Sequence, residues 1–480
     1  MEVSVPIGTT GDKDISWRLN GDASSVVSGI LKVGSCRVSL SQGDPDPAFN
    51  PPNGYVLYNG WNKDSYVGVV IQRDRKIIMS TGLDNGMDSD VGVLRYNEDG
   101  TLDSTFGMGG VFIYDGKNGD DCGRLAAVQT DGKIVLTGYS SNGENSDILV
   151  MRVNSDGTLD KSFGSKGISI YDNSNREDYG RAIAIQTDGK IVVTARSTGD
   201  STSIAIILRY NGNGTLDTTF GTNGVVRYEG GQGNDGFRDV VIQADGKIVV
   251  SGYTKNASGF DVLTARYNVK GLLDNAFGTS GVVTYDGGYG NNGARGIAIQ
   301  SDGKIVVSGS EYNGTDLDVL VLRYNPDGTS DKAFGTNGMV SYDSGNGDDN
   351  GRRLAIQSGN KIVVTGNTPN GTDGNVLILR YNGNGSADGA FGSNGVVNLN
   401  IVMGDNFGEG VAIQEDKKIL IAGGSSNGTD NEVMLLRVLG AADQSGGSSD
   451  GGCFIQTAGS GFWPGPMQNR MQESKDCSNQ

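Results

Sequence analysis

The sequence predicts an all-β fold, a seven-bladed β-propeller of four-stranded antiparallel blades. Three observations predict it. One motif recurs at a fixed step, each repeat holds four short strand-like segments, and the array starts and ends with complementary parts of one repeat. Glycine supplies 79 of the 480 residues, which disfavours long helices.

The recurring motif is close to QTDGKIVVTG and returns every 57 residues. Its lysine stands at Lys76, Lys133, Lys190, Lys247, Lys304, Lys361 and Lys418. An arginine series that runs from Arg95 to Arg437 keeps the same step. A step this regular indicates a repeat architecture with seven copies, and not a set of unrelated domains.

One repeat, residues 181–228, shows what each copy can build. RAIAIQ alternates apolar and polar residues, KIVVTA is rich in β-branched residues, and SIAIILRY and GVVRY follow after polar loops. Asp-Gly and Asn-Gly pairs between these segments suit tight hairpin turns. Four antiparallel strands make a propeller blade, although 57 residues exceed the roughly 40 to 50 of familiar propeller repeats.

The two ends of the array predict a closed ring. The last copy stops after its third strand, near residues 436–438, and lacks the Phe-Gly segment and the fourth strand. Asp46 and Phe49 stand at the matching places before the first copy, and GYVLYN at 54–59 resembles the missing strand. We therefore expect the N-terminal strand to complete the last blade, which leaves no open sheet edge between first and last.

Two extensions flank the repeats. The domain organisation that we predict is an N-terminal β extension at 1–45, the propeller at 46–438, and a Gly/Ser linker with a C-terminal tail at 439–480. Cys453 and Cys477 flank the tail. In an oxidising extracellular setting they could form a disulfide, and unpaired thiols are the alternative.

The segment LRYNGNGTLDTTFGTNGVVRYEG, from Leu208, resembles the repeat of the bacterial delta-sixty family of β-propellers, over about residues 46–438. The tail CFIQTAGSGFW resembles the CFIATA-type tails of some secreted bacterial proteins, except at Gln456. The resemblance implies a mostly secreted or surface-exposed class without a common catalytic residue. We expect an extracellular or cell-surface location, although residues 1–10 show no secretory signal.

Composition excludes several classes of function. The formal net charge is −17, which disfavours a nucleic-acid groove, and no apolar run of 18 residues exists that could span a membrane. The chain contains no histidine. Ser-His-Asp triads and His-ligated zinc are therefore excluded, whereas carboxylate chemistry and calcium remain open.

A repeated arginine and a repeated aspartate suggest a structural contact in each blade. The third-strand arginines occur in all seven copies, and so does an aspartate series made of Asp46, Asp103, Asp160, Asp217, Asp274, Asp331 and Asp388. We expect each arginine to bind an aspartate and hold the loop that follows the strand. A ligand site rarely requires seven identical residues.

A second arginine series begins the first strand of five copies and consists of Arg124, Arg181, Arg238, Arg295 and Arg352. Val67 and Glu409 occupy this position in the other two copies. First strands lie nearest the axis of a propeller, so these arginines could form an anion site at the mouth of the channel. The alternative, which the sequence favours, is a loop contact with the acidic series that starts at Asp64, three residues earlier.

Two acidic pairs lie in glycine-rich loops, Asp120 with Asp121 and Asp348 with Asp349. Carboxylate and backbone oxygens in such loops could bind calcium, but neither loop has the spacing of an EF-hand or of a nonapeptide calcium repeat. Calcium stays an alternative at these four residues. No other cofactor is expected.

These observations favour a non-enzymatic structural or protein-interaction unit that self-associates through its terminal extensions. The blades are nearly identical, whereas enzymes need unlike residues around the channel. The first alternative is a module that binds a small anion, glycan or peptide at the channel mouth. The second is a carboxylate-based hydrolase or lyase, which would need two unlike carboxylates and a metal.

Overall fold

The computed structural model describes residues 13–20, 26–33, 40–59, 67–174, 176–199, 202–230, 232–371, 373–426, 431–441 and 455–458. The chain divides into two compact units, one of residues 41–443 and one made from residues 1–40 and 444–480. The sequence-derived propeller limits, 46 and 438, fall within the larger unit. Among the described residues, no helix has the length and apolar character needed to cross a membrane.

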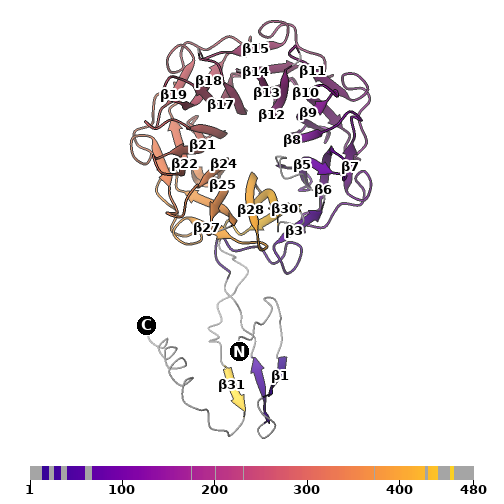
Figure 1. Cartoon of the computed structure of the whole chain (residues 1–480), viewed down its shortest axis with the longest axis vertical. Helices are drawn as coiled ribbons and strands as arrows, with labels where there is room; N and C mark the ends of the chain where they lie inside the picture. The colour runs from indigo at the N-terminus through magenta and orange to yellow at the C-terminus, as the bar shows by residue number, and fades with distance from the viewer. Residues whose placement is uncertain are drawn as a thin grey trace. The chain divides into compact units, whose positions relative to one another are not determined.

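Seven four-stranded antiparallel sheets form the larger unit and are arranged as a ring (Figure 1). The innermost strands are β4 (Gly68–Ile71), β8 (Asp121–Val128), β12 (Glu177–Ile185), β16 (Gly236–Ile242), β20 (Gly293–Ile299), β24 (Asn350–Gln357) and β28 (Asp405–Ile413). The second strands are β5 (Ile77–Asp84), β9 (Ile134–Ser141), β13 (Ile191–Thr198), β17 (Ile248–Lys255), β21 (Ile305–Tyr312), β25 (Lys361–Pro369) and β29 (Ile419–Ser426). The predicted seven-bladed propeller is confirmed.

The outer half of each blade follows the same order. The third strands are β6 (Ser89–Tyr96), β10 (Ser146–Val153), β14 (Ser203–Tyr210), β18 (Phe260–Tyr267), β22 (Leu317–Tyr324), β26 (Gly374–Tyr381) and β30 (Asn431–Val438). The outermost strands are β7 (Val111–Tyr114), β11 (Ile168–Tyr171), β15 (Val225–Tyr228), β19 (Val282–Tyr285), β23 (Met339–Tyr342), β27 (Val396–Leu399) and β3 (Tyr55–Asn59). One short 3-10 turn, η1 (Ser358–Asn360), precedes β25.

The N-terminal strand β3 closes the ring, as the sequence predicts. It pairs antiparallel with β30, and Tyr55 lies opposite Leu436. Figure 1 shows this early strand, in indigo, beside the last strands of the chain. Two backbone hydrogen bonds strengthen the closure, from Gly392 N to Gln42 O (2.8 Å) and from Asn50 N to Asp99 O (2.7 Å). Residues far apart in sequence therefore share one blade.

The hydrophobic core lies between the blades. One cluster joins Ile207 and Phe220 of the third blade to Phe237 and Ile248 of the fourth. Another joins the seventh blade to the first and includes Phe49, so the seam is packed like the other junctions. Full burial of one such side chain stabilises a fold by about 1.5–3 kcal/mol. Each sheet is buried on both faces, which explains its continuous apolar strands.

An Arg–Asp clamp, which we define as the third-strand arginine with its aspartate and phenylalanine, recurs in all seven blades. In the third blade, Arg209 Nε donates to Asp217 Oδ2 at 2.8 Å, and Arg209 Nη1 donates to Val269 O of the next blade at 2.6 Å. The guanidinium carbon lies 4.3 Å from the ring centre of Phe220. The predicted arginine–aspartate pairing is confirmed, and it also joins neighbouring blades.

The same clamp forms across the seam. Arg437 Nε donates to Asp46 Oδ2 at 2.7 Å, and its Nη1 donates to Glu98 O of the first blade at 2.5 Å. The guanidinium carbon lies 4.6 Å from the ring centre of Phe49. The N-terminal segment thus supplies the two clamp residues that the last repeat lacks.

Ionisation of the clamp aspartates is favoured. Burial alone would raise the pKa of Asp217, but hydrogen bonds from Thr219 and the charges of Arg209 and Lys190 outweigh it and lower the pKa to about 2. The pKa values of Asp103 and Asp160 are lowered in the same way. The clamp is therefore an ion pair at neutral pH.

The smaller unit is a three-stranded antiparallel sheet made of β1 (Lys13–Asn20), β2 (Val26–Val33) and β31 (Ile455–Ala458). In its register Ile30 lies opposite Ala458 and Val33 opposite Ile455. The N-terminal extension and the C-terminal tail therefore pair with each other. The sequence predicted strands in the extension but none in the tail.

Candidate functional site

A β-bulge in the innermost strands positions the second arginine series. In β8, β12, β16 and β20 the pairing skips one residue, which is Arg124, Arg181, Arg238 and Arg295 respectively. In β28 the skipped residue is Glu409. A bulge re-aims the side chain of the extra residue. The chain thus places one long charged side chain at the same height in each of these blades.

These side chains converge on one cavity, the axial cavity, which has a volume of about 10 Å³ and is lined by Arg124, Arg181, Arg238, Arg295, Arg353 and Glu409. Six different blades contribute one residue each. The space is close to that of a single water molecule. Five arginines against one glutamate make it a positive centre in a chain of net charge −17.

The structure puts Arg353, and not the predicted Arg352, in this lining. The bulge of β24 spans two residues, because the pairing shifts between Gly351 and Leu354. Arg352 Nη1 instead lies 3.1 Å from Glu409 Oε2. Counting by 57 residues could not reveal this difference, since the register of β24 decides it.

Two carboxylates balance part of the arginine charge. Arg353 Nη1 lies 2.8 Å from Asp239 Oδ1, and Ile297 N donates to Asp239 Oδ2 at 3.0 Å. Burial raises the pKa of Asp239, although the charge of Arg353 opposes this rise. Glu409 is only 4% exposed and pairs with Arg352. The axial cavity therefore contains fixed ion pairs on one side.

Aromatic rings lie against three of the other arginines. The Arg124 guanidinium carbon lies 5.5 Å from the ring centre of Tyr139, and that of Arg181 lies 5.6 Å from Tyr179. Arg238 has the same relation to Tyr253, at 5.3 Å. Such cation–π contacts orient a guanidinium without neutralising its charge. The positive centre is thus preorganised.

A larger pocket of about 330 Å³, the side pocket, opens beside the axial cavity. It is lined by Arg196, Arg238, Tyr253, Phe260, Asn291, Asn292, Gly293, Ala294, Arg295, Ser310, Leu317 and Asn350. Arg196 Nη1 donates to Tyr253 Oη at 3.2 Å, and the rings of Tyr253 and Phe260 meet edge to face. Its volume is at the lower end of the range of about 300–1,000 Å³ for ligand sites.

Sequence reasoning missed most of the side pocket. At the position of Tyr253 the six other copies carry Gly82, Tyr139, Arg196, Ser310, Asn367 and Gly424, so this position does not follow the repeat. Departure from the repeat was the signal that could have indicated the pocket. Arg238 and Arg295, which the sequence did predict, line both the side pocket and the axial cavity.

The acidic series three residues before the arginines holds its own loops. Asp121, Asp178 and Asp235 each accept a hydrogen bond from the backbone nitrogen five residues earlier, at 2.5, 2.6 and 2.5 Å. Asp349 does the same with Ser344 N at 2.5 Å. Asp64 lies outside the described residues. In these four loops the aspartate accepts from the backbone, and the expected loop contact with arginine stays a prediction.

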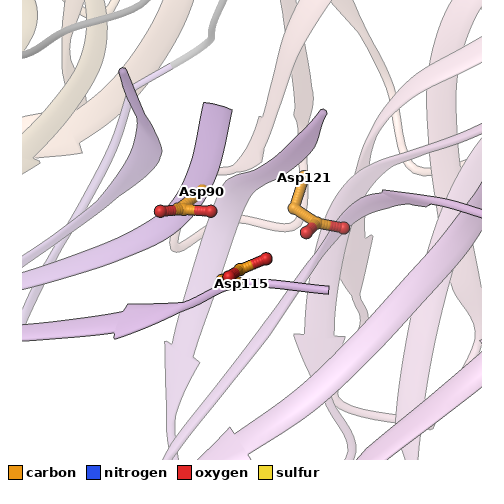
Figure 2. A group of neighbouring side chains, drawn as sticks. All are labelled: Asp90, Asp115 and Asp121. Atoms are coloured by element: carbon orange, nitrogen blue, oxygen red, sulfur yellow. The ribbon is translucent and has the colours of Figure 1, made fainter. Parts of the chain in front are cut away.

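Within each predicted acidic pair, the two aspartates accept hydrogen bonds from different backbone nitrogens. Asp120 Oδ1 accepts from Ser89 N, and Asp348 Oδ1 accepts from Leu317 N, both at 2.9 Å across blade junctions. Among the described residues, two groups of three carboxylates could hold a metal ion, and the first includes the predicted Asp121. They are Asp90 with Asp115 and Asp121 (Figure 2), and Asp147 with Asp172 and Asp178. The sequence did not indicate that Asp90 and Asp115 lie beside Asp121.

The predicted Cys453–Cys477 disulfide lies outside the described residues. Cys122 is described and buried, and its thiol contacts Gly123 O at 3.3 Å.

Comparison with known families supports the repeat assignment. A family model described as a domain of unknown function (DUF5122) beta-propeller matches residues 72–106, 129–163, 186–220, 243–277 and 300–334. The repeats fit a β-propeller repeat family. No curated protein matches the sequence. The likenesses to the delta-sixty repeat and to the CFIATA tail stay predictions.

Solved structures with a similar fold include a streptogramin B lyase, at 13% identity and a TM-score of 0.46, with 80% of this chain and 97% of that chain covered. A polysaccharide lyase is 11% identical with a TM-score of 0.47, at coverages of 85% and 98%. A gluconolactonase from Xanthomonas campestris is 12% identical with a TM-score of 0.38, at coverages of 88% and 100%. At such identities the likeness shows the propeller fold alone.

One functional expectation is corrected by these findings. The sequence analysis favoured a non-enzymatic structural unit, and the absence of histidine and the uniform blades were its grounds. The propellers named above are enzymes, so a propeller fold does not indicate a non-enzymatic protein. The non-enzymatic interpretation is therefore wrong. No reaction is assigned to this chain by the comparison. An extracellular location stays a prediction.

Proposed function

We propose that this propeller binds a small acidic ligand in the side pocket, with its anionic group on Arg238 and Arg295. The observation that carries the proposal is that both arginines line the side pocket and the axial cavity together. An anion there would face an array of guanidinium groups from neighbouring blades. The pocket also has the volume that a small ligand needs.

The chemistry of the lining favours a carboxylate attached to a hydroxylated ring, such as an acidic sugar. A guanidinium donates two parallel hydrogen bonds to a carboxylate, which sets its orientation as well as its charge. Asn291, Asn292 and Asn350 offer amide donors and acceptors for hydroxyl groups. Tyr253 and Phe260 add aromatic surface for the ring itself.

Charge also favours a small ligand over a polyanion. The chain carries a formal net charge of −17, so a long polyanion is repelled by most of the surface. A monoanion that enters the pocket meets the arginines at short range. Its binding should weaken at high salt only modestly, because the arginines are partly buried and poorly screened.

Calorimetric titration with glucuronate and with neutral glucose tests the proposal. We expect glucuronate to bind and glucose not to bind, since only the former presents a carboxylate. Arg238→Gln and Arg295→Gln should each weaken glucuronate binding by about tenfold or more, which corresponds to roughly 1.4 kcal/mol per tenfold. Mass spectrometry of the ligand after incubation shows whether binding leads to turnover.

The matched control is Arg227→Gln. Arg227 lies on the outermost strand β15, where its Nη2 donates to Tyr171 Oη at 2.7 Å, and it lines neither cavity. Glucuronate binding should be unchanged in this variant. Equal binding of glucose and glucuronate, or full binding by Arg238→Gln, would contradict the proposal.

A further inference from the structure

Two acid clusters lie away from the side pocket, at the junctions of the first three blades. The first acid cluster consists of Asp90 on β6, Asp115 after β7 and Asp121 on β8. The second acid cluster consists of Asp147 on β10, Asp172 after β11 and Asp178 on β12. In each, two aspartates come from one blade and the third comes from the next. Each cluster therefore bridges a junction.

The geometry of both clusters suits a single cation. One carboxylate oxygen from each residue lies within 4.8 Å of the other two. Figure 2 shows the three side chains of the first acid cluster directed toward one another. Oxygen ligands lie about 2.3–2.6 Å from Ca²⁺, so two ligands of one ion are at most about 5 Å apart. Both clusters meet this condition without any side-chain movement.

Two buried carboxylate oxygens in these clusters have no hydrogen-bond partner among the described atoms. They are Oδ1 of Asp90 and Oδ1 of Asp147, whose residues are 7% and 6% exposed. Asp121 and Asp178 are fully buried, and each has a serine hydroxyl as a hydrogen-bond neighbour, Ser140 and Ser197 respectively. An unsatisfied buried charge is costly to a fold and requires a physical explanation. One cation in each cluster would satisfy these oxygens.

The second oxygen of each of these residues does have a donor. Asp90 Oδ2 accepts from Asn85 Nδ2 at 3.0 Å, and Asp121 Oδ2 accepts from Gly116 N at 2.5 Å. The second acid cluster repeats this arrangement with Asn142 Nδ2 at 3.1 Å and Asn173 N at 2.6 Å. One oxygen of each carboxylate is therefore held by a hydrogen bond. The same arrangement recurs in both clusters.

Other junctions show that the fold does not need these charges. The three equivalent positions between the sixth and seventh blades are all amides, Asn375, Asn400 and Asn406. There Asn406 Nδ2 donates to Asn400 Oδ1 at 3.2 Å and to Val402 O at 2.8 Å. Neutral side chains can therefore build the same junction. Blade packing therefore does not explain why these positions are aspartates in the two acid clusters.

Acidic residues at these positions can also be satisfied within the protein. Between the third and fourth blades, Asp235 accepts from Gly230 N at 2.5 Å and from Thr254 Oγ1 at 2.6 Å. Ile204 stands there where the acid clusters have Asp90 and Asp147. Between the fifth and sixth blades, Asp318, Asp343 and Asp349 occupy all three positions. There Asn313 Nδ2 donates to both oxygens of Asp318, at 3.1 Å each. Among the described residues, only the two acid clusters bring three carboxylates within 4.8 Å of one another.

Burial and neighbouring carboxylates raise the pKa values of two aspartates in these clusters. Burial raises the pKa of Asp121, and the nearby carboxylates of Asp90 and Asp115 add to this rise. Burial likewise raises the pKa of Asp178 to about 6, with a further contribution from Asp147 and Asp172.

We propose that each acid cluster binds one Ca²⁺ ion, which joins the first blade to the second and the second to the third. All donors are oxygens, as Ca²⁺ prefers, and the exposed Asp115 and Asp172 leave room for water to complete the coordination shell. The sites are separate from the proposed ligand pocket between the fourth and fifth blades. Their role is to hold blade junctions together in a calcium-containing environment.

Calorimetric titration of the chelator-treated full chain with CaCl₂ tests this proposal. We expect two bound ions per chain. Asp121→Asn should leave one, because it disrupts only the first acid cluster, and the double variant Asp121→Asn/Asp178→Asn should leave none. Asp235→Asn is the matched control, at the same position of another junction, and should still bind two ions. The melting temperature of the wild type should rise by a few degrees with calcium.

A second measurement does not depend on the stability of a variant. Tyr114 and Tyr171 lie beside the two clusters, where the nearby aspartates help to raise their pKa values. Tb³⁺ in a calcium site should therefore emit on excitation of tyrosine in the wild type, and added Ca²⁺ should quench this emission. Absence of both calcium heat and terbium emission would overturn the proposal. So would two ions bound by the double variant, or equal affinity for Mg²⁺.

Discussion

The Arg–Asp clamp and the innermost bulges are both repeated features, yet they differ in how strictly they repeat. Arginine, aspartate and phenylalanine recur in every clamp, including the one that spans the seam through Asp46 and Phe49. The bulge positions carry arginine in β8 to β20, two arginines in β24 and glutamate in β28. A feature that is identical in all seven blades stabilises the ring. A feature that varies from blade to blade around the axis can form a binding site for a ligand.

The largest expected effect is the loss of a clamp. Arg209→Ala leaves Asp217 buried without its guanidinium, which should lower the free energy of unfolding by about 3–5 kcal/mol. Denaturant unfolding measures the change. Arg227→Ala on the outer strand is the control and should change stability by less than about 1 kcal/mol. A loss for Arg209→Ala as small as that of the control would show that the clamp is dispensable.

The seam should be as strong as an internal junction. Phe49 and Phe220 are both fully buried and both lie against a clamp arginine. Replacement of either by alanine should cost about 3–5 kcal/mol in unfolding free energy. The comparison of the two variants is the measurement, with each as the control for the other. A much smaller cost for Phe49→Ala would mean that the ring is held mainly by its other six junctions.

Acid should weaken the clamps. The pKa of Asp217 is about 2 in the folded chain and near 3.8 as its ordinary value, so its ion pair stabilises the fold above pH 4. That contribution is lost as the pH falls through about 2. Asp217→Asn should therefore show a smaller loss of stability between pH 4 and pH 2 than the wild type. An unchanged slope in unfolding experiments across this range would contradict the assignment.

The smallest expected effect on stability belongs to the bulge arginines. Arg238→Gln should change the free energy of unfolding by less than about 1 kcal/mol, because its side chain is only partly buried. The same change should abolish most of the glucuronate binding proposed for the side pocket. Parallel unfolding and titration experiments separate the two results. A large loss of stability would place Arg238 with the clamps and not with the ligand site.

Several features could be predicted from the sequence because they depend on local, repeated interactions. The 57-residue step set the number of blades, and the missing fourth strand of the last copy revealed the closure by residues 54–59. Apolar alternation and turn residues define strands within a few residues of each other. The Arg–Asp pairs were predictable for the same reason, since in six of the seven the two residues lie eight positions apart in one repeat.

The functional residues were harder to predict, because they combine side chains from different blades. Asp90 and Asp121 are 31 residues apart and belong to different sheets, and only the packing of the blades brings their carboxylates together. Arg196, Tyr253 and Phe260 form one wall although each departs from its repeat. The periodic sequence obscured these contacts, since nothing in a single repeat indicates which neighbour it will face.

The sequence by itself determined the class of fold, the number of blades and the clamps that hold them, because backbone pairing and apolar burial repeat with the chain. The tertiary structure decided which charges meet. Arg353 and not Arg352 reaches the axis because β24 has a wider bulge, and three aspartates form a cluster because two blades meet there. Contacts between charged residues of different blades depend on where their side chains point. A repeat pattern does not specify the direction of a side chain at a bulge.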